Sequence, residues 1–137
     1  MTTFESAVKT ITSTEETVFG TLSDLRNLEK SKHLLPANTI QDLEFHENRC
    51  LFSVNPIGKI GLSIVEREPS KMIKFGSDDA PIDFNLWIHL NETTANDTQM
   101  QVKVQADIPP MVKMMFGGRM QQFVDQFADA IAGIKYA

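Results

Sequence analysis

The chain has 137 residues, of which 42% are hydrophobic and 23% charged, and this length fits one domain with one core over residues 1–137. Its formal net charge is −5 at pH 7 and no Lys/Arg run is present, which disfavours nucleic-acid binding. No segment is long and apolar enough to be an integral membrane span.

The N-terminal third predicts a short strand followed by two short helices. Apolar and polar residues alternate over Phe4–Lys9, which is the period of a strand. Ser13 and Glu16 have the spacing of a capping box, so we expect a helix to begin there. Gly20 and the polar residues after it indicate a bend into a second helix that ends before Pro36.

From residue 40 to residue 108 the pattern changes to alternating or β-branched runs, separated by turn residues about every ten positions. The breaks are short, which predicts antiparallel neighbours in a meander, because parallel strands need long crossovers. The six predicted strands are Ile40–Phe45, Cys50–Val54, Lys59–Arg67, Met72–Ser77, Asp83–Asn91 and Gln99–Ile108.

One face of this sheet is predicted to be apolar and the other polar. The last two strands alternate strictly, so their apolar side chains share one dry face, which needs a cover from within the domain. Trp87 and His89 fall on the wet face. The residues assigned to the dry face are Ile60, Leu62, Ile64, Ile73, Phe75, Phe84, Leu86, Ile88, Val102 and Val104.

The C-terminal residues predict a long helix that covers the dry face. At 100° per residue, its apolar positions fall on one stripe with steps of three and four. Met111 and Met115 fall on nearly the opposite side of the helix. The apolar stripe consists of Phe116, Met120, Phe123, Phe127, Ile131 and Ile134.

The stretch MVKMMFGGRM, Met111–Met120, is the unusual part of that helix. Each glycine inside a helix costs about 1 kcal/mol relative to alanine, whereas methionine is a flexible side chain that accommodates varied apolar shapes. Either the helix runs unbroken, or Gly117 and Gly118 bend it and re-aim the methionines. Three interpretations stay open: core methionines beside a hinge, the adaptable rim of a cavity, or an oligomer contact.

Two stretches and the order of the elements carry a family resemblance. TVFGTLSDLRNLEK, Thr17–Lys30, has a Val-aromatic pair, then Leu-Ser-Asp, then Asn-Leu shortly before a proline. IVEREPSKMIKF, Ile64–Phe75, has a strand, a Glu-rich proline turn and a second strand. Across essentially the whole chain this resembles the START-like superfamily, also called SRPBCC, which includes the polyketide cyclase/dehydrase-like and Bet v 1-like families.

The resemblance implies an α+β helix-grip fold, in which a curved antiparallel sheet of about seven strands wraps around the long C-terminal helix. It also implies an apolar cavity between the sheet and that helix, which in many members holds a lipid, sterol, polyketide or other hydrophobic molecule. Family members differ widely in their catalytic residues, so the resemblance assigns no catalytic role to this chain.

Few residues offer catalytic or metal chemistry. Cys50 is the only cysteine, which excludes an intrachain disulfide, and its alternating spacing is typical of a buried small hydrophobe. The three histidines lack metal-ligand spacing, so neither a metal nor another cofactor is predicted. Ser6 is a polar candidate for the inner face. Arg119 lies about 60° from the helical stripe, where it would either pair with a ligand carboxylate or be solvated.

These observations predict a domain that binds a small hydrophobic molecule between the sheet and the C-terminal helix without catalysis. The N-terminus lacks the basic start and apolar run of a secretory signal, which predicts a cytoplasmic protein. The residues predicted to line the ligand site are Leu62, Phe75, Phe84, Leu86, Ile88, Val102, Val104, Met111, Met115, Phe116, Arg119, Met120, Phe123 and Phe127.

Two other functions stay open. One is a cyclase, dehydratase or hydrolase acting on an aromatic or polyketide-like substrate, which needs at least two polar side chains converging in the cavity. The other is an interaction module or homo-oligomer that uses the Trp87 face or exposed methionines.

Overall fold

The computed structural model describes residues 2–34, 40–54, 58–78, 83–134 and 136, with the side chains of residues 30–34, 40, 54 and 116 left out. None of the described helices is both long enough and apolar enough to cross a bilayer. The elements in chain order are β1 (Thr2–Glu5), β2 (Lys9–Ile11), α1 (Glu15–Leu22), the 3₁₀ helix η1 (Leu25–Leu34), β3 (Ile40–Phe45), β4 (Arg49–Val54), β5 (Gly58–Glu68), β6 (Met72–Asp78), β7 (Phe84–Thr94), β8 (Asp97–Ala106) and α2 (Pro110–Ala132).

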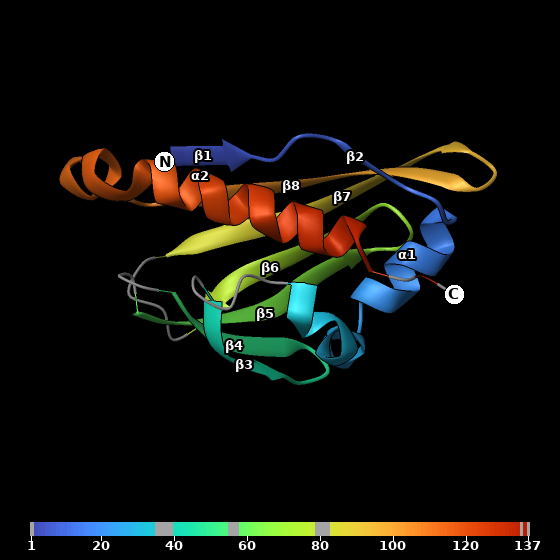
Figure 1. The fold of residues 1–137 in the computed structure, drawn as a ribbon, viewed down its shortest axis with the longest axis horizontal. Coiled ribbons are helices and arrows are strands. Elements are labelled where there is room, and N and C mark those ends of the chain that lie inside the picture. Colours follow the sequence, from blue (N-terminus) through green and yellow to red (C-terminus); the bar gives the residue numbers. More distant parts are fainter. Residues whose placement is uncertain (1, 35–39, 55–57, 79–82, 135, 137) are drawn as a thin grey trace.

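The strands form one antiparallel sheet in the order β1-β8-β7-β6-β5-β4-β3, and β2 also pairs with β8. The sheet curves, and α2 lies along its inner side, with α1 and η1 near the C-terminal end of α2 (Figure 1). The predicted α+β helix-grip fold is therefore confirmed, and all six strands expected between residues 40 and 108 are present with bounds shifted by at most three residues.

The strand expected at the N-terminus is broken into two at Ser6. Glu5 pairs with Lys103 and Lys9 with Met100, so four steps along the N-terminal chain match three along β8. The Ser6 hydroxyl accepts the Val102 N–H at 3.0 Å, and the Ser6 N–H donates to the Val102 carbonyl at 2.9 Å. The Ser6 hydroxyl thus takes the place of a backbone carbonyl as the acceptor for Val102, at the extra residue between β1 and β2. Ser6 is buried in this position.

The first helix begins one residue later than the capping-box spacing predicts. Thr14 is the N-cap, and its hydroxyl accepts the Thr17 N–H at 3.2 Å. Ser13 is held elsewhere, because its carbonyl accepts the buried Thr98 hydroxyl at 2.7 Å. The prediction of Ser13 as the cap was therefore wrong, although the helix itself is where the sequence placed it.

The predicted dry face of the sheet is the core of the molecule. Most of the assigned side chains are less than a tenth exposed, and only Ile64 and Phe84 are half-buried. Alternation therefore placed the core correctly, because a one-residue error in phase would have turned every one of these side chains outward.

Trp87 lies in the middle of a row of charged side chains that crosses the outer face from strand to strand. Lys74 and Lys103 are its cross-strand neighbours, and their Nζ atoms lie 5.4 and 5.9 Å from its ring centroid. Glu66 and Glu5 follow on either side in the pairing register. The indole is thus half-covered by lysine stems and cation–π contacts within the chain.

The helix α2 runs without a break through Gly117 and Gly118, so the sequence alternative of an unbroken helix is the one observed. It packs on β8, β1 and β2. Gln121 Nε2 donates to the Glu5 carbonyl at 2.9 Å, and Lys9 forms an ion pair with Asp129 at 2.6 Å. These contacts tie α2 to one side of the sheet, and its other flank faces β3 and β4.

Candidate functional site

A cavity of about 40 Å³ lies between α2, the inner face of the sheet and the helical segment α1–η1. The sheet contributes its floor, and the two helical regions contribute its walls. The fifteen lining residues are Leu22, Leu25, Leu28, Leu43, Phe45, Cys50, Phe52, Leu62, Phe75, Ile88, Phe123, Phe127, Ala130, Ile131 and Ile134.

The lining residues divide into buried floor and wall residues and a half-buried rim. The floor residues from β4 to β7 are all buried, among them Leu62, Phe75 and Ile88. The half-buried residues come from η1, β3, α2 and the residues just after α2. The cavity therefore reaches the surface between these three elements. The rim consists of Leu28, Leu43, Phe45, Phe123, Phe127 and Ile134.

Three phenylalanines span the gap between α2 and β4. Phe123 and Phe127 are one helical turn apart and stack with ring centroids 6.0 Å apart. Phe52 continues the stack from β4, with its centroid 5.9 Å from that of Phe123. Phe123 and Phe127 are half-buried at the rim, so their rings can turn about their side-chain torsions.

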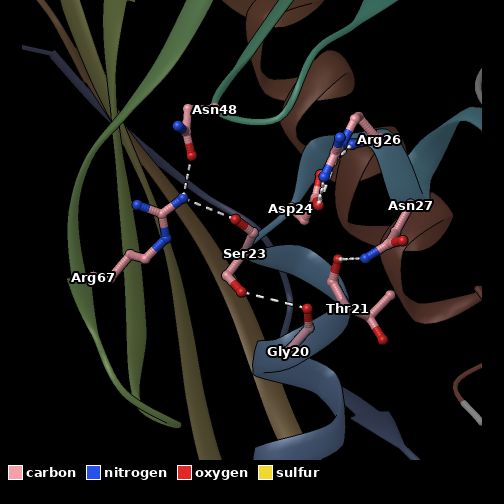
Figure 2. Close-up of polar contacts among 8 residues, drawn as sticks. All are labelled: Gly20, Thr21, Ser23, Asp24, Arg26, Asn27, Asn48 and Arg67. Atoms are coloured by element: carbon pink, nitrogen blue, oxygen red, sulfur yellow. Dashed lines mark hydrogen bonds and ion pairs between the residues drawn. The ribbon is translucent and has the colours of Figure 1, made fainter.

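Polar contacts fasten the α1–η1 wall to the sheet. Arg67 on β5 reaches Asn48 in the β3–β4 turn and the carbonyl of Ser23 at the end of α1 (Figure 2). Within the helical wall, the Arg26 guanidinium bonds Asp24 at 2.6 Å and holds the pKa of that carboxyl below its ordinary value. The wall is thus organised by exposed polar groups on its outside and by leucines on its inside.

The last turn of α2 is closed by Tyr136. Its hydroxyl donates to the Ile131 carbonyl at 2.8 Å, and burial raises the pKa of this phenol. Ile131 and Ile134 both line the cavity, so this bond holds the C-terminal end of α2 beside the cavity.

The chemistry of the lining is almost wholly apolar. Cys50 is the one lining residue with a polar side-chain atom, and burial raises the pKa of its thiol to about 12, so the thiol is neutral at physiological pH. Across the described part of the chain, no three His, Cys, Asp or Glu side chains gather to hold a metal ion. Such a lining stabilises an apolar molecule by burying its surface. A polar group on that molecule would find no hydrogen-bond partner in the lining, and its burial would cost free energy.

Five of the residues predicted from the sequence line this cavity, namely Leu62, Phe75, Ile88, Phe123 and Phe127. Leu86, Val102 and Val104 are buried in the core outside the lining, and Phe84 and Met120 are half-buried against that core.

The N-terminal end of α2 presents its methionines to solvent. Met111 and Met115 are 73% and 66% exposed, and Arg119 is also exposed. None of these three residues lines the cavity, because α2 continues unbroken through this stretch and keeps them on the side away from the buried stripe. The Phe116 side chain lies outside the described residues.

Sequence reasoning missed the contribution of the N-terminal helices and of β3. The apolar side of the first helix was visible at Leu22 and Leu25, but nothing local says that it closes a cavity rather than packs on a solid core. Cys50 and Phe52 alternate in phase with the dry face, and the helical stripe extends to Ile131 and Ile134, so these four carried a usable signal.

Comparisons with known proteins give the fold a name. No sequence family model matches the chain, and no curated protein matches it by sequence. Solved structures do match, among them a START superfamily protein of Mycobacterium smegmatis, at TM-score 0.64 and 14% identity over 96% of this chain and 94% of that one. The chain has the START-like fold.

Two further solved structures resemble this chain in fold. A conserved protein of Geobacillus kaustophilus matches at TM-score 0.65 and 17% identity, over 96% of this chain and 93% of that one. Norcoclaurine synthase of Thalictrum flavum matches at TM-score 0.72 and 12% identity, over 96% and 84% of the two chains. Sequence identities this low establish shared architecture and leave chemistry to be argued from the site.

Proposed function

We propose that this protein binds a small hydrophobic molecule in the cavity between α2, the sheet and the α1–η1 wall, without chemical conversion. The observation that carries the proposal is the apolar cavity itself, because a domain of this size gains stability by filling its interior. Ligand sites are lined mainly by apolar and aromatic side chains, and this interior gap has such a lining, with half-buried aromatic side chains at its rim.

The size of the cavity limits the class of ligand. About 40 Å³ has room for roughly three water-sized molecules, so the space as it stands suits a single ring or a short chain. A longer lipid or a polyketide requires the rim phenylalanines or the helical wall to move outward. Aromatic and short aliphatic molecules are therefore the first ligands to test.

An enzymatic role has less support. The solved norcoclaurine synthase structures include one in complex with dopamine and hydroxybenzaldehyde, so this architecture accommodates small aromatic molecules in that enzyme. Acid–base catalysis needs polar groups that converge on the substrate. Among the described lining residues only Cys50 has one, and its raised pKa leaves the thiol unreactive.

An interaction function through the Trp87 face also has less support than ligand binding. Lys74 and Lys103 already lie against the indole, so that face holds no bare aromatic patch. The exposed methionines of α2 keep the oligomer alternative testable, by light scattering at increasing protein concentration.

The test is uptake of toluene, a neutral single-ring aromatic probe, followed by calorimetry and by thermal shift. A ligand that prefers the folded state raises the melting temperature with concentration. Ala130→Leu adds three carbons to a cavity-lining position, and we expect at least a tenfold loss of affinity.

Ala132→Leu is the matched control, since it makes the same change on the same helix at a position outside the lining. We expect it to bind the probe as the wild type does. Equal affinities for the two variants, or no uptake by the wild type of any compound in an aromatic and short-chain panel, would refute the proposal.

A further inference from the structure

The α1–η1 segment is fastened to the sheet at its exposed edge. The Leu25 N–H donates to the Glu47 carbonyl at 3.0 Å, and Arg67 Nη2 donates to the Ser23 carbonyl at 2.9 Å. The same Nη2 donates to Asn48 Oδ1, so one guanidinium joins the segment, the β3–β4 turn and β5 (Figure 2). The two contacts lie side by side where the segment meets the turn.

The turn is a firm anchor for this fastening. The Asn48 carbonyl accepts the Ile64 N–H of β5 at 2.8 Å, and the His46 N–H donates to the Arg49 carbonyl at 2.8 Å. Arg67 itself lies within β5, in register with Ile73 of β6. One side of the contact is therefore held by the backbone hydrogen bonds of the sheet.

The helical side of the contact is a point where the chain changes direction. Ser23 is the C-cap of α1, and η1 begins two residues later, at Leu25. A cation at the C-terminal end of a helix is favourable, because the last carbonyls there lack intrahelical partners. Arg67 thus binds the segment at its joint, between a regular helix and a 3₁₀ helix.

The residues that this contact holds down are part of the cavity wall. Leu25 and Leu28 belong to the segment and line the cavity, and Leu28 is at the rim opposite Leu43 of β3. Arg67 is exposed, so water competes for its hydrogen bonds and the fastening is weak compared with a buried one. A weakly fastened segment over an apolar wall can open while the sheet and α2 stay folded.

We propose that the segment Ser23–Leu28 opens to admit the ligand, and that Arg67 is the positioning residue that sets how often it opens. The opening is a property of the free protein, whereas its role in ligand uptake rests on the proposed function. Arg67 does not line the cavity. It acts through the segment that carries Leu25 and Leu28, which do line it.

Hydrogen exchange tests the opening without any ligand. In Arg67→Met we expect the Leu25 amide to exchange about fivefold faster than in the wild type. The variant loses the Arg67–Ser23 hydrogen bond and keeps the neighbouring Leu25–Glu47 hydrogen bond. Arg67→Lys keeps a hydrogen-bond donor, so its Leu25 exchange rate should fall between those of the wild type and Arg67→Met. Arg26→Met is the matched control, since that arginine bonds Asp24 within the segment and we expect no change at Leu25.

NMR line-shape analysis of toluene binding then tests the role in uptake. Association and dissociation should both accelerate by about the factor seen in exchange, with less than about a twofold change in Kd, because the contact favours the closed form with and without ligand. Leu25 exchange that is unchanged in Arg67→Met would overturn the proposal. So would β7 and β8 amides that accelerate equally, since Arg67 would then stabilise the whole fold.

The remaining outcomes separate this inference from the proposed function. Faster Leu25 exchange with unchanged probe kinetics overturns the uptake role and leaves ligand binding intact. If the wild type takes up no probe, the proposed function and the uptake role both fail, and Leu25 exchange alone decides whether Arg67 holds the segment closed.

Discussion

Phe52 of β4 and Phe123 of α2 stack with centroids 5.9 Å apart and ring planes 19° apart, and they bridge the flank of α2 that faces away from β1 and β8. Phe123→Ala removes the middle ring of the stack that continues to Phe127. We expect the free energy of unfolding to fall by about 2 kcal/mol in urea denaturation, less than for a fully buried Phe because Phe123 is half-buried.

The stack itself is measured by a double-mutant cycle of Phe52→Leu and Phe123→Leu. Leucine keeps most of the apolar volume, so the coupling between the two changes reports the ring contact, which we expect to be about 0.5–1.5 kcal/mol. A coupling of zero would mean that the rings share the cavity edge without stabilising one another.

The exposed methionines provide the second prediction. Met111, Met114 and Met115 are between 66% and 88% exposed, so replacing all three with Ser should change the free energy of unfolding by less than about 0.5 kcal/mol per site. Probe uptake should be unchanged, because neither Met111 nor Met115 lines the cavity.

Met120→Ser is the control for that triple variant. Met120 lies on the same helix but is half-buried against the core, so we expect it to destabilise the protein by about 1 kcal/mol or more. Weaker probe binding by the triple Ser variant at wild-type stability would return Met111–Met120 to the rim of the site and revise the cavity argued here.

The fold was predictable because it rests on local periodicity. Alternation over Phe84–Asn91 and Gln99–Ala106 fixes which side chains face inward, and a wrong register would bury Lys103 or His89. The split at Ser6 was not predictable, because it depends on a hydroxyl that meets the Val102 amide from 96 positions away.

The candidate site was only half predictable, for a physical reason. Periodicity tells which face of an element is apolar, but two apolar faces can close on each other or stay apart. Leu86 and Val102 satisfy the same pattern as Leu62 and Ile88, yet only the latter two face the cavity. The difference is set by the position of α2, which is tied to β1 and β2 through contacts such as Lys9–Asp129.

Glycines in α2 and β5 give the third prediction. A Cβ added at Gly118 would meet no heavy atom within 4 Å, so Gly118→Ala should raise the free energy of unfolding by about 0.5–1 kcal/mol. At Gly61 the added Cβ would lie 2.2 Å from the Asp78 carbonyl oxygen, so Gly61→Ala should destabilise the protein by more than about 2 kcal/mol. Chemical denaturation of both variants checks the opposite signs.

A Gly118→Ala variant that lost stability would show that the helix needs a bend there, contrary to the unbroken α2. If it gained stability but lost probe binding, the glycine would serve flexibility in ligand uptake instead.

The fourth prediction concerns the first turn of α1 and pH. Lys71 Nζ lies 2.7 Å from Glu15 Oε2, and the Glu92 N–H donates to the same oxygen at 2.8 Å. The Lys71 hydrogen bond first, and the Glu92 amide second, lower the pKa of the Glu15 carboxyl. A carboxyl with a lowered folded-state pKa stabilises the protein above its unfolded pKa, and this contribution is lost as pH falls through the folded value.

We therefore expect Glu15→Gln to be less stable than the wild type at pH 7 by under about 1 kcal/mol, since Lys71 is half exposed. The difference should begin to shrink as the pH falls below the ordinary glutamate pKa of about 4.5, and it should vanish below the lowered folded-state pKa, where Glu15 is neutral as glutamine is. Glu16→Gln removes a charge from the same helical turn at an exposed position, so it separates the helix-dipole effect from the Lys71 and Glu92 contacts. Denaturation midpoints of the three proteins between pH 2 and 7 decide the matter, and a Glu15→Gln deficit that did not shrink as the pH fell below about 4.5 would mean that packing, not charge, holds α1 to β7.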